Sequence, residues 1–497
     1  MENQKIISPN MLKSFFFENK VALMFLIISG VAFWASGMTT VMFFNELSVR
    51  IGRDTFLVLS LLIPVVAGLG LNFGIVIGAM SAQIALFFVV LFGGSGASGL
   101  FTVALVATPI AILLGYLVGR LFNSMKGSEM IGGMIVALFA AGFYQFFFLF
   151  FLGGIVPIES RMMTSSGIGV LNVIDIGASP SYMRQALDNV TMLHILTVAF
   201  WAMLVFVAIM LIVRLVKKQA ITMKGPLSIR RPIFALIVLA IVYIASGFGG
   251  MAFVNGFTLW LYQDRLNALY ALWWGGLLAA LLMGYAIIKA KVVEKSPGVP
   301  IKPIAYLVIV IIAFLLSLWT PVYTGLENVG LPVLTYLIII GLCVAIKWFL
   351  NTRLGQNMRS VGQSRPVATA AGINVDRTRI IAMIMSTVLA AYGQIIMLQN
   401  FGVMNTYSAH ENVGLFAIAA FLVGGASVAK ASIKNAILGV ILFHSLFILA
   451  PFAGANLMDS TLIGEYFREF VAYAVIALAL VMHAWQRKKK RKAKENE

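Results

Sequence analysis

The sequence predicts an all-α polytopic membrane protein, and three observations support this. Hydrophobic residues make up 61% of the 497 residues and charged residues only 11%, whereas about a quarter of a soluble chain is charged. The mean hydropathy is +0.97, and apolar stretches of about 20 residues, the length that crosses a bilayer, recur from Val21 to Val481. The single cysteine, Cys343, excludes a disulfide scaffold.

Hydropathy places about fourteen spans in the chain, and some of them would be half-helices. Their ranges are 21–44, 55–70, 73–93, 100–120, 130–156, 191–213, 233–256, 270–288, 304–320, 332–350, 380–398, 413–428, 435–452 and 470–486. With a cytoplasmic N-terminus, about 30 of the 36 lysines and arginines fall on the inner side, as the positive-inside rule expects. The outer ones are Arg50, Arg53, Arg161, Arg184, Arg265 and Arg468. This predicts a multi-pass protein of the cytoplasmic (plasma or inner) membrane with both termini in the cytoplasm.

The net charge of +18 follows from this topology rather than from nucleic-acid binding. We interpret the basic tail, Arg487 to Lys494, as the flank that fixes the last span, with a phospholipid anchor as the alternative. No signal peptide is expected, because the run from Val21 is too long and further spans follow it.

The predicted spans hold neutral polar residues and, at their centres, no Asp or Glu. The candidates for a translocation pathway are Asn72, Ser81, Gln83, Gln145, Gln394 and His444. Such groups suit a passage for a small polar solute, but they equally suit hydrogen bonds between helices. For His444 alone, a satisfied histidine of the bundle is the more ordinary interpretation. No catalytic residue and no metal site is predicted.

Glycines recur in two regions, at Gly68, Gly70, Gly74 and Gly78 and at Gly393, Gly424, Gly425 and Gly439. Small residues at this spacing allow helices to approach closely, and glycines also bound broken helices at transporter binding sites. The spacing alone does not choose between these two interpretations.

A phosphate-binding loop is excluded at the segment from Gly424 to Lys430. The pattern requires a glycine where Ala429 stands and a hydroxyl where Ala431 stands. We therefore expect no cofactor in this chain, and any ATP would have to be bound by another protein.

The predicted cytoplasmic loop, 351–379, is the most informative segment. Arg365 and Pro366 favour a helix start, three alanines follow among the next five residues, and Gly372 suits a C-terminal cap. The sequence predicts a short helix outside the membrane whose small side chains suit docking.

This loop resembles that of the permease family that serves ribose, other simple sugars, nucleosides and branched-chain amino acids, the membrane subunits of ATP-binding-cassette (ABC) importers. The matching residues are Gly355, Asn357, Arg359, Val361, Gly362, Ala368, Ala371, Gly372, Ile373, Asn374 and Val375. Four further segments of the chain resemble elements of the family pattern: residues 69–79, 386–393, 417–425 and 435–439. The resemblance covers about 55–120 and 332–485.

The resemblance implies that the short helix is a coupling helix seated on a separate ATPase. The residues that would contact it are Arg359, Gly362, Arg365, Pro366, Ala368, Ala370, Ala371, Gly372, Ile373 and Asn374. It also implies a second permease, either a copy or a paralogue, and an extracytoplasmic solute-binding protein. The lipid bilayer is a further expected partner, and no nucleic acid is expected. Sugars or nucleosides are favoured over branched-chain amino acids as solutes.

The resemblance also predicts a domain organisation with a ten-helix core and inserted spans. The expected parts are the cytoplasmic segment 1–20, core spans 21–156, the extracytoplasmic loop 157–190, inserted spans 191–320, the C-terminal core 332–486 with coupling loop 351–379, and the basic tail 487–497. Loop 157–190 is a contact for the binding protein or a mere connector.

Two other classes of protein remain open. An ion-coupled secondary transporter of a small polar solute would need a membrane carboxylate or an ion site at an unwound helix. A membrane enzyme or assembly factor would need clustered catalytic groups. The sequence favours the transporter subunit over both, because no carboxylate lies at the centre of a predicted span and no cluster of catalytic groups stands out. An ion site at an unwound helix is not visible in a sequence.

Overall fold

The computed structural model describes residues 20–125, 127–216, 232–233, 236–237, 240, 265–288, 301–427, 431–460, 462–471, 473–474, 477–478 and 481. The chain forms two compact units, the first made of residues 1–186 and 338–497 and the second of residues 187–337. The predicted insertion 191–320 lies inside the second unit, and its status as an insertion stays a prediction. Segment 1–19, tail 487–497 and most of the predicted span 233–256 lie outside the described residues.

The first unit is a helical bundle. Its helices are α2 (Lys20–Ser36), α3 (Thr40–Ser60), α4 (Leu62–Val66), α5 (Ile75–Leu91), α6 (Gly96–Ser124), α7 (Glu129–Phe146), the π-helix η1 (Phe147–Ile155), α15 (Arg353–Gln363), α16 (Arg365–Ala370), α17 (Val375–Phe401), α18 (Glu411–Val423) and α19 (Ile433–Met458). Helix α14 (Val333–Phe349) crosses the boundary between the units.

Among the described residues, six helices are long and apolar enough to cross a membrane: 96–124, 131–155, 192–212, 268–288, 375–401 and 433–458. A further pair, α14 and α15, meets the same test together but is bent by 76°. Large apolar side chains lie on the outside of these helices, such as Leu138 and Phe139, which are 75% and 74% exposed. Such surfaces are costly in water and natural in hydrocarbon, so the chain is a multi-pass membrane protein.

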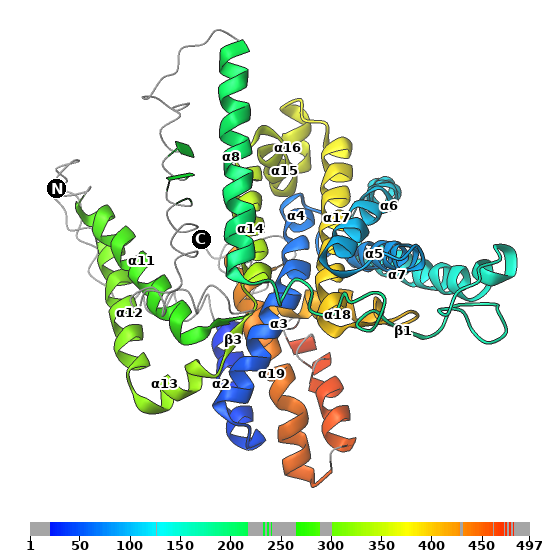
Figure 1. Ribbon diagram of the computed structural model, residues 1–497. Coiled ribbons are helices and arrows are strands. Elements are labelled where there is room, and N and C mark those ends of the chain that lie inside the picture. The colour runs from blue at the N-terminus through cyan, green and yellow to red at the C-terminus, as the bar shows by residue number, and fades with distance from the viewer. Residues whose placement is uncertain are drawn as a thin grey trace, which may run out of the picture. The chain divides into compact units, whose positions relative to one another are not determined.

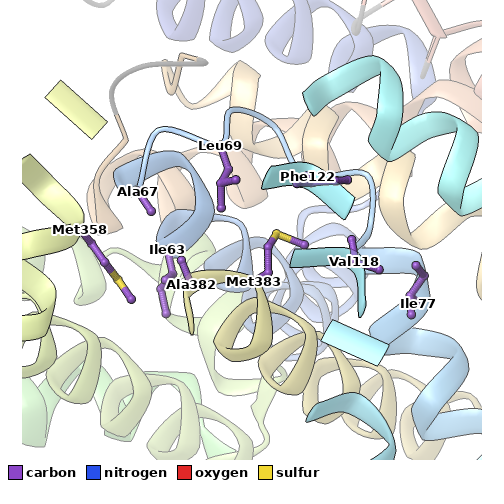
Figure 2. Packing of buried hydrophobic residues seen from close by; sticks show 9 residues of the cluster. All are labelled: Ile63, Ala67, Leu69, Ile77, Val118, Phe122, Met358, Ala382 and Met383. Atoms are coloured by element: carbon purple, nitrogen blue, oxygen red, sulfur yellow. The ribbon is translucent and has the colours of Figure 1, made fainter. Parts of the chain in front are cut away.

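Helix α17 is the centre of the first unit and contacts α3, α4, α5 and α6. Small residues allow this close packing, since a Cβ on Gly78 would meet the backbone of Thr387 and one on Gly119 would lie 3.0 Å from Cα of Ile380. At one end of α17, a cluster of buried apolar residues fills the space between the helices (Figure 2). The residues shown are Ile63, Ala67, Leu69, Ile77, Val118, Phe122, Met358, Ala382 and Met383.

The glycines of the N-terminal half fulfil both predicted roles, close helix packing and a broken helix. Gly68 and Gly70 have φ angles of +73° and +77° in the break between α4 and α5, whereas Gly78 lies at the contact of α5 with α17. The chain therefore has a broken helix and a close helix contact within eleven residues, 68–78.

The start of the bundle differs from the prediction. The predicted span 21–44 is interrupted at residues 37–39, where Thr39 caps α3 by accepting a hydrogen bond from the Met42 amide at 3.4 Å. Helix α3 then continues through Arg50 and Arg53, which the sequence analysis placed in an outer loop. Hydropathy misses the middle of this helix because it counts each charged residue as polar. In the structure these charges are paired within the helix, for instance Glu46 with Arg50 one turn later.

A two-stranded sheet joins the predicted loop 157–190 to the end of α17. Strand β1 (Val173–Asp175) pairs antiparallel with β4 (Val403–Asn405), with Val173 opposite Asn405. The loop is thus attached to the same end of the bundle as the C-terminus of α17.

The second unit contains α8 (Met192–Val216), α11 (Ala268–Ile288), α12 (Ile301–Ser317), α13 (Thr320–Glu327) and a short pairing of β2 (Leu266–Asn267) with β3 (Gly330–Leu331). Helix α11 contacts α12 and α13, and the indole of Trp273 donates to Ser317 Oγ at 2.9 Å. Three predicted spans, 191–213, 270–288 and 304–320, are helices here.

Candidate functional site

The predicted short helix of the loop is present as α16. Pro366 lies in its first turn, and Gly372 follows its end with a φ of +76°, a conformation that glycine adopts without strain. Asn374 then caps α17 by accepting a hydrogen bond from the Arg377 amide at 2.9 Å. Gly372 and Asn374 therefore fix where α16 ends and where α17 begins.

Most of the predicted coupling residues form an exposed surface around α16. Arg359, Pro366, Ala370, Ala371, Gly372 and Asn374 are exposed, and Gly362, Arg365 and Ile373 are partly so. Ala368 differs, because its side chain is 1% exposed and packs against its own chain. Val367, which the sequence analysis did not single out, is 67% exposed and extends the surface. The role of these residues in coupling stays a prediction.

An ion cluster attaches α16 to the rest of the bundle. Nη2 of Arg365 and Nη2 of Arg379 both donate to Oε1 of Glu129, at 2.5 and 2.6 Å. Arg379 is fully buried, and its Nη2 also donates to the Phe122 carbonyl at 3.4 Å. One carboxylate on α7 thus joins the first residue of α16 to the first turns of α17.

The same arginine reaches the break between α4 and α5. Nη2 of Arg365 donates to the carbonyl of Gly68 at 3.2 Å, and Gly362 lies against Val66 and Gly68 so closely that a Cβ on either glycine would clash with backbone. The loop therefore touches the interrupted helix both through a close contact of main chain with main chain and through the side chain of Arg365.

A cavity of about 370 Å³ lies at the opposite end of α17. Its walls come from α3, from Met397 and Phe401 near the end of α17, and from α18, α19 and residue Arg468 in the helical segment 462–471. In Figure 1, α16 lies near one end of α17 and α18 near the other.

A chain of charged groups forms one wall of the cavity. Arg53 binds the carboxylate of Asp54 through two nitrogens, at 3.0 and 2.8 Å. His444 places Nε2 at 3.1 Å from Oδ2 of the same carboxylate. Asp54 therefore has two partners, and both line the cavity beside it.

Two further arginines face the cavity from different helices. The guanidinium carbons of Arg50 and Arg468 lie 5.4 and 5.3 Å from the centroid of the Phe447 ring. Each also pairs with an acid on its own helix, Glu46 at 3.0 Å and Glu465 at 2.7 Å. These acids do not line the cavity and are 45% and 56% exposed.

Of the six predicted pathway residues, His444 alone lines this cavity. Asn72 donates to Ser386 Oγ at 3.2 Å, Ser81 donates to the Ile77 carbonyl at 2.9 Å, and all three of Ser81, Gln83 and Gln394 are buried. Gln145 is partly exposed on α7. Their place in a pathway stays a prediction.

A second polar group lies around Gln83. Its Oε1 is 3.0 Å from Nδ1 of His410, whose ring lies 4.6 Å from that of Tyr144. Within the described part of the chain, Gln83 Nε2, His410 Nε2 and the Tyr144 hydroxyl are buried and have no hydrogen-bond partner.

Sequence reasoning missed Asp54 and the role of Glu129. Asp54 stands between the predicted spans 21–44 and 55–70, and Glu129 stands at the edge of another. The signal for Asp54 was the adjacent Arg53. Glu129 had no such signal, because its partners Arg365 and Arg379 lie 236 and 250 residues away in sequence. Among the described residues, no group of three or more His, Cys, Asp or Glu side chains could hold a metal ion.

Comparison with known proteins gives the family. The family model described as "Branched-chain amino acid transport system / permease component" matches residues 205–480, more than half of the chain. That range includes much of the predicted insertion and leaves out 55–120, whose resemblance stays a prediction.

Two relatives are similar over shorter stretches. The xylose transport system permease protein XylH of Haemophilus influenzae is 34% identical over 123 residues, 24% of this chain and 32% of the relative. The high-affinity branched-chain amino acid transport system permease protein LivH of Salmonella typhimurium is 25% identical over 151 residues, 30% of this chain and 43% of the relative. The chain thus aligns with less than half the length of either relative, and no solved structure matches it. The protein belongs to the family of branched-chain amino acid transport system permease components.

Proposed function

We propose that this chain is the permease subunit of an ABC importer, which carries a small polar solute into the cell and is driven by a separate ATPase seated on α16. The observation that carries the proposal is helix α16, which exposes Ala370 and is followed by the exposed Ala371. Its first residue is joined to α7 and α17 by the Glu129 cluster. A movement of α16 caused by the ATPase would be transmitted to α7 and α17 through those ion pairs.

The other subunits of the transporter are proposed from the permease family to which the chain belongs. ATP and Mg²⁺ would bind the ATPase, a second permease, identical or related, would complete the transport path, and an extracytoplasmic binding protein would deliver the solute. The loop 157–190, held to the end of α17 by the β1–β4 pair, is the proposed contact for that protein.

The proposed orientation places α16 in the cytoplasm together with both termini, in a chain of about fourteen spans and half-spans. Helix α17 has 27 residues and a length of about 40 Å, which matches a bilayer with its headgroups. The cavity at its other end then opens toward the extracytoplasmic side.

The solute class is the finer part of the proposal. One relative is named for xylose and the other for branched-chain amino acids, so the two names do not choose between the classes. The neutral amide and hydroxyl groups of the spans favour a hydroxylated solute, a sugar or nucleoside, over a branched-chain amino acid.

The test is ATP-driven uptake in vesicles that contain the permease together with its proposed ATPase and solute-binding protein. Ala371→Arg adds a long charged side chain to the exposed face of α16, and we expect ATP hydrolysis to continue while uptake is lost. Gln356→Arg, an exposed position on α15, is the matched control and should keep uptake. Normal uptake by Ala371→Arg would contradict the coupling role.

An ion-coupled secondary transporter is the second candidate, because the buried pair of Asp54 and His444 is the kind of membrane carboxylate that such carriers use. The two hydrogen bonds that Arg53 donates to Asp54 weigh against it, since they already occupy the carboxylate that would have to bind and release the ion. Vesicles that hold the permease alone distinguish the two: accumulation driven by an ion gradient without an ATPase would support the carrier.

A further inference from the structure

We propose that the cavity at the end of α17 binds an anionic group, a carboxylate or a phosphate, on the solute. This inference rests on the proposed function and makes the solute class sharper: a hydroxylated molecule that carries a negative charge, such as a sugar acid or sugar phosphate.

The first argument is the charge of the cavity wall. Three arginines and one aspartate line it, and Asp54 is already bound by Arg53 and lies next to His444. Arg50 and Arg468 each pair with an acid that is about half exposed and lies outside the cavity lining, Glu46 and Glu465.

The second argument is the convergence of those two arginines. They come from α3 and from the segment 462–471, far apart in sequence, yet both guanidinium groups lie over one ring, that of Phe447, at 5.4 and 5.3 Å. Both side chains also line the cavity, so one anion bound there can interact with positive charge from two separate helices. Each guanidinium has five donors, so one contact with Glu46 or Glu465 leaves others for a ligand.

The third argument is the shape and chemistry of the remaining walls. A volume of about 370 Å³ falls in the range of small-molecule sites and exceeds what one acidic side chain of a partner protein would fill. Met397, Phe401 and Phe416 supply apolar surface beside the charged wall. This combination suits a small molecule with a ring or carbon skeleton and one charged end, because guanidinium groups bind carboxylate and phosphate in a fork geometry.

The test is ligand binding by the purified permease, without ATPase or binding protein, measured as thermal stabilisation at constant ionic strength. The probes are glucuronate, glucose 6-phosphate and inorganic phosphate, with glucose as the neutral counterpart. We expect saturable stabilisation by the acidic probes and at least tenfold weaker binding of glucose.

The variants Arg50→Gln and Arg468→Gln should each weaken binding of the acidic probes by roughly tenfold, while Arg120→Gln, on the exposed face of α6, should not. Arg468→Gln guards against misfolding, because its side chain is 34% exposed. Equal stabilisation by glucose and glucuronate, or unchanged binding in both cavity variants, would overturn the proposal.

Two further measurements distinguish failure of the anion site from failure of the proposed transport function. If the variants bind acidic probes normally but no longer bind the solute-binding protein, the arginines recognise carboxylates of that protein and the proposal is wrong. If acidic probes bind as expected but ATP drives no uptake in the complete system, the proposed function fails and the anion site stands.

Discussion

Glu129 shows how much one side chain contributes to the cytoplasmic end of the bundle. Burial alone would raise the pKa of this carboxyl, but hydrogen bonds from the backbone at Glu129 and Gly127 and from Arg365 outweigh it and hold the pKa below its usual value. The ionised carboxylate is therefore the form that the fold prefers. It neutralises Arg379, whose side chain has no exposure to solvent.

We expect Glu129→Gln to destabilise the detergent-solubilised protein by about 3 kcal/mol near neutral pH, because it leaves Arg379 buried without its anion. A carboxyl with a lowered pKa stabilises the fold above its unfolded pKa, and that contribution is lost as the pH falls through the folded value. The difference in unfolding free energy between wild type and variant should thus be constant above about pH 5 and shrink below it.

Glu465→Gln is the matched control, because its pair with Arg468 is exposed and contributes about 1 kcal/mol or less. A Glu129→Gln variant as stable as this control at pH 7, or a difference that grows on acidification, would show that the ion cluster does not hold α16 in place.

At the scale of the helices, close contacts between backbones decide the packing. A Cβ on Gly439 of α19 would collide with the Ala420 carbonyl of α18 and lie close to Gly424. These glycines are the ones that the sequence analysis left between two interpretations, and at this pair close packing is the outcome.

Gly439→Ala should therefore lower the unfolding free energy by about 1–3 kcal/mol through overpacking. Gly142→Ala, in α7, meets no atom within 4 Å and should be neutral or stabilise by up to about 1 kcal/mol, since alanine favours helix. Thermal unfolding of both variants in the same detergent measures the difference. Equal effects would mean that α18 and α19 do not pack through this glycine.

The elements that depend on local patterns were predictable, and those that depend on distant partners were not. The caps of α16 follow from Pro366 and Gly372, and long apolar runs gave most of the helices. The partners of Glu129 lie 236 and 250 residues away in sequence, so no local pattern assigns it. Helix α3 was cut short because hydropathy counts Arg50 and Asp54 as polar, although burial against partners makes them part of the bundle.

At the scale of the whole molecule, the first unit places its two candidate surfaces at the two ends of α17. The exposed loop around α16 precedes the helix, and the charged cavity surrounds its last turn. If α16 faces the cytoplasm, the loop 157–190 must face the other side, because β1 joins it to β4 just after α17.

Cysteine labelling checks this orientation in a Cys343→Ser background. An impermeant maleimide added to intact cells should label Ser166→Cys, an exposed position of the loop 157–190, and not Arg377→Cys, an exposed position at the start of α17. Inverted vesicles should give the reverse pattern. Labelling of both positions from one side would rule out the proposed topology.

The contact between Gly362 and the Val66–Gly68 backbone has a mechanical consequence. Where side chains separate two helices, a small movement of one helix can be taken up by a change of rotamer and need not move the other helix. Here the main chain of Gly362 lies directly against that of Val66 and Gly68, and the side chain of Arg365 adds a hydrogen bond to Gly68. We therefore expect a movement of the loop to displace the interrupted helix directly at this pair of glycines.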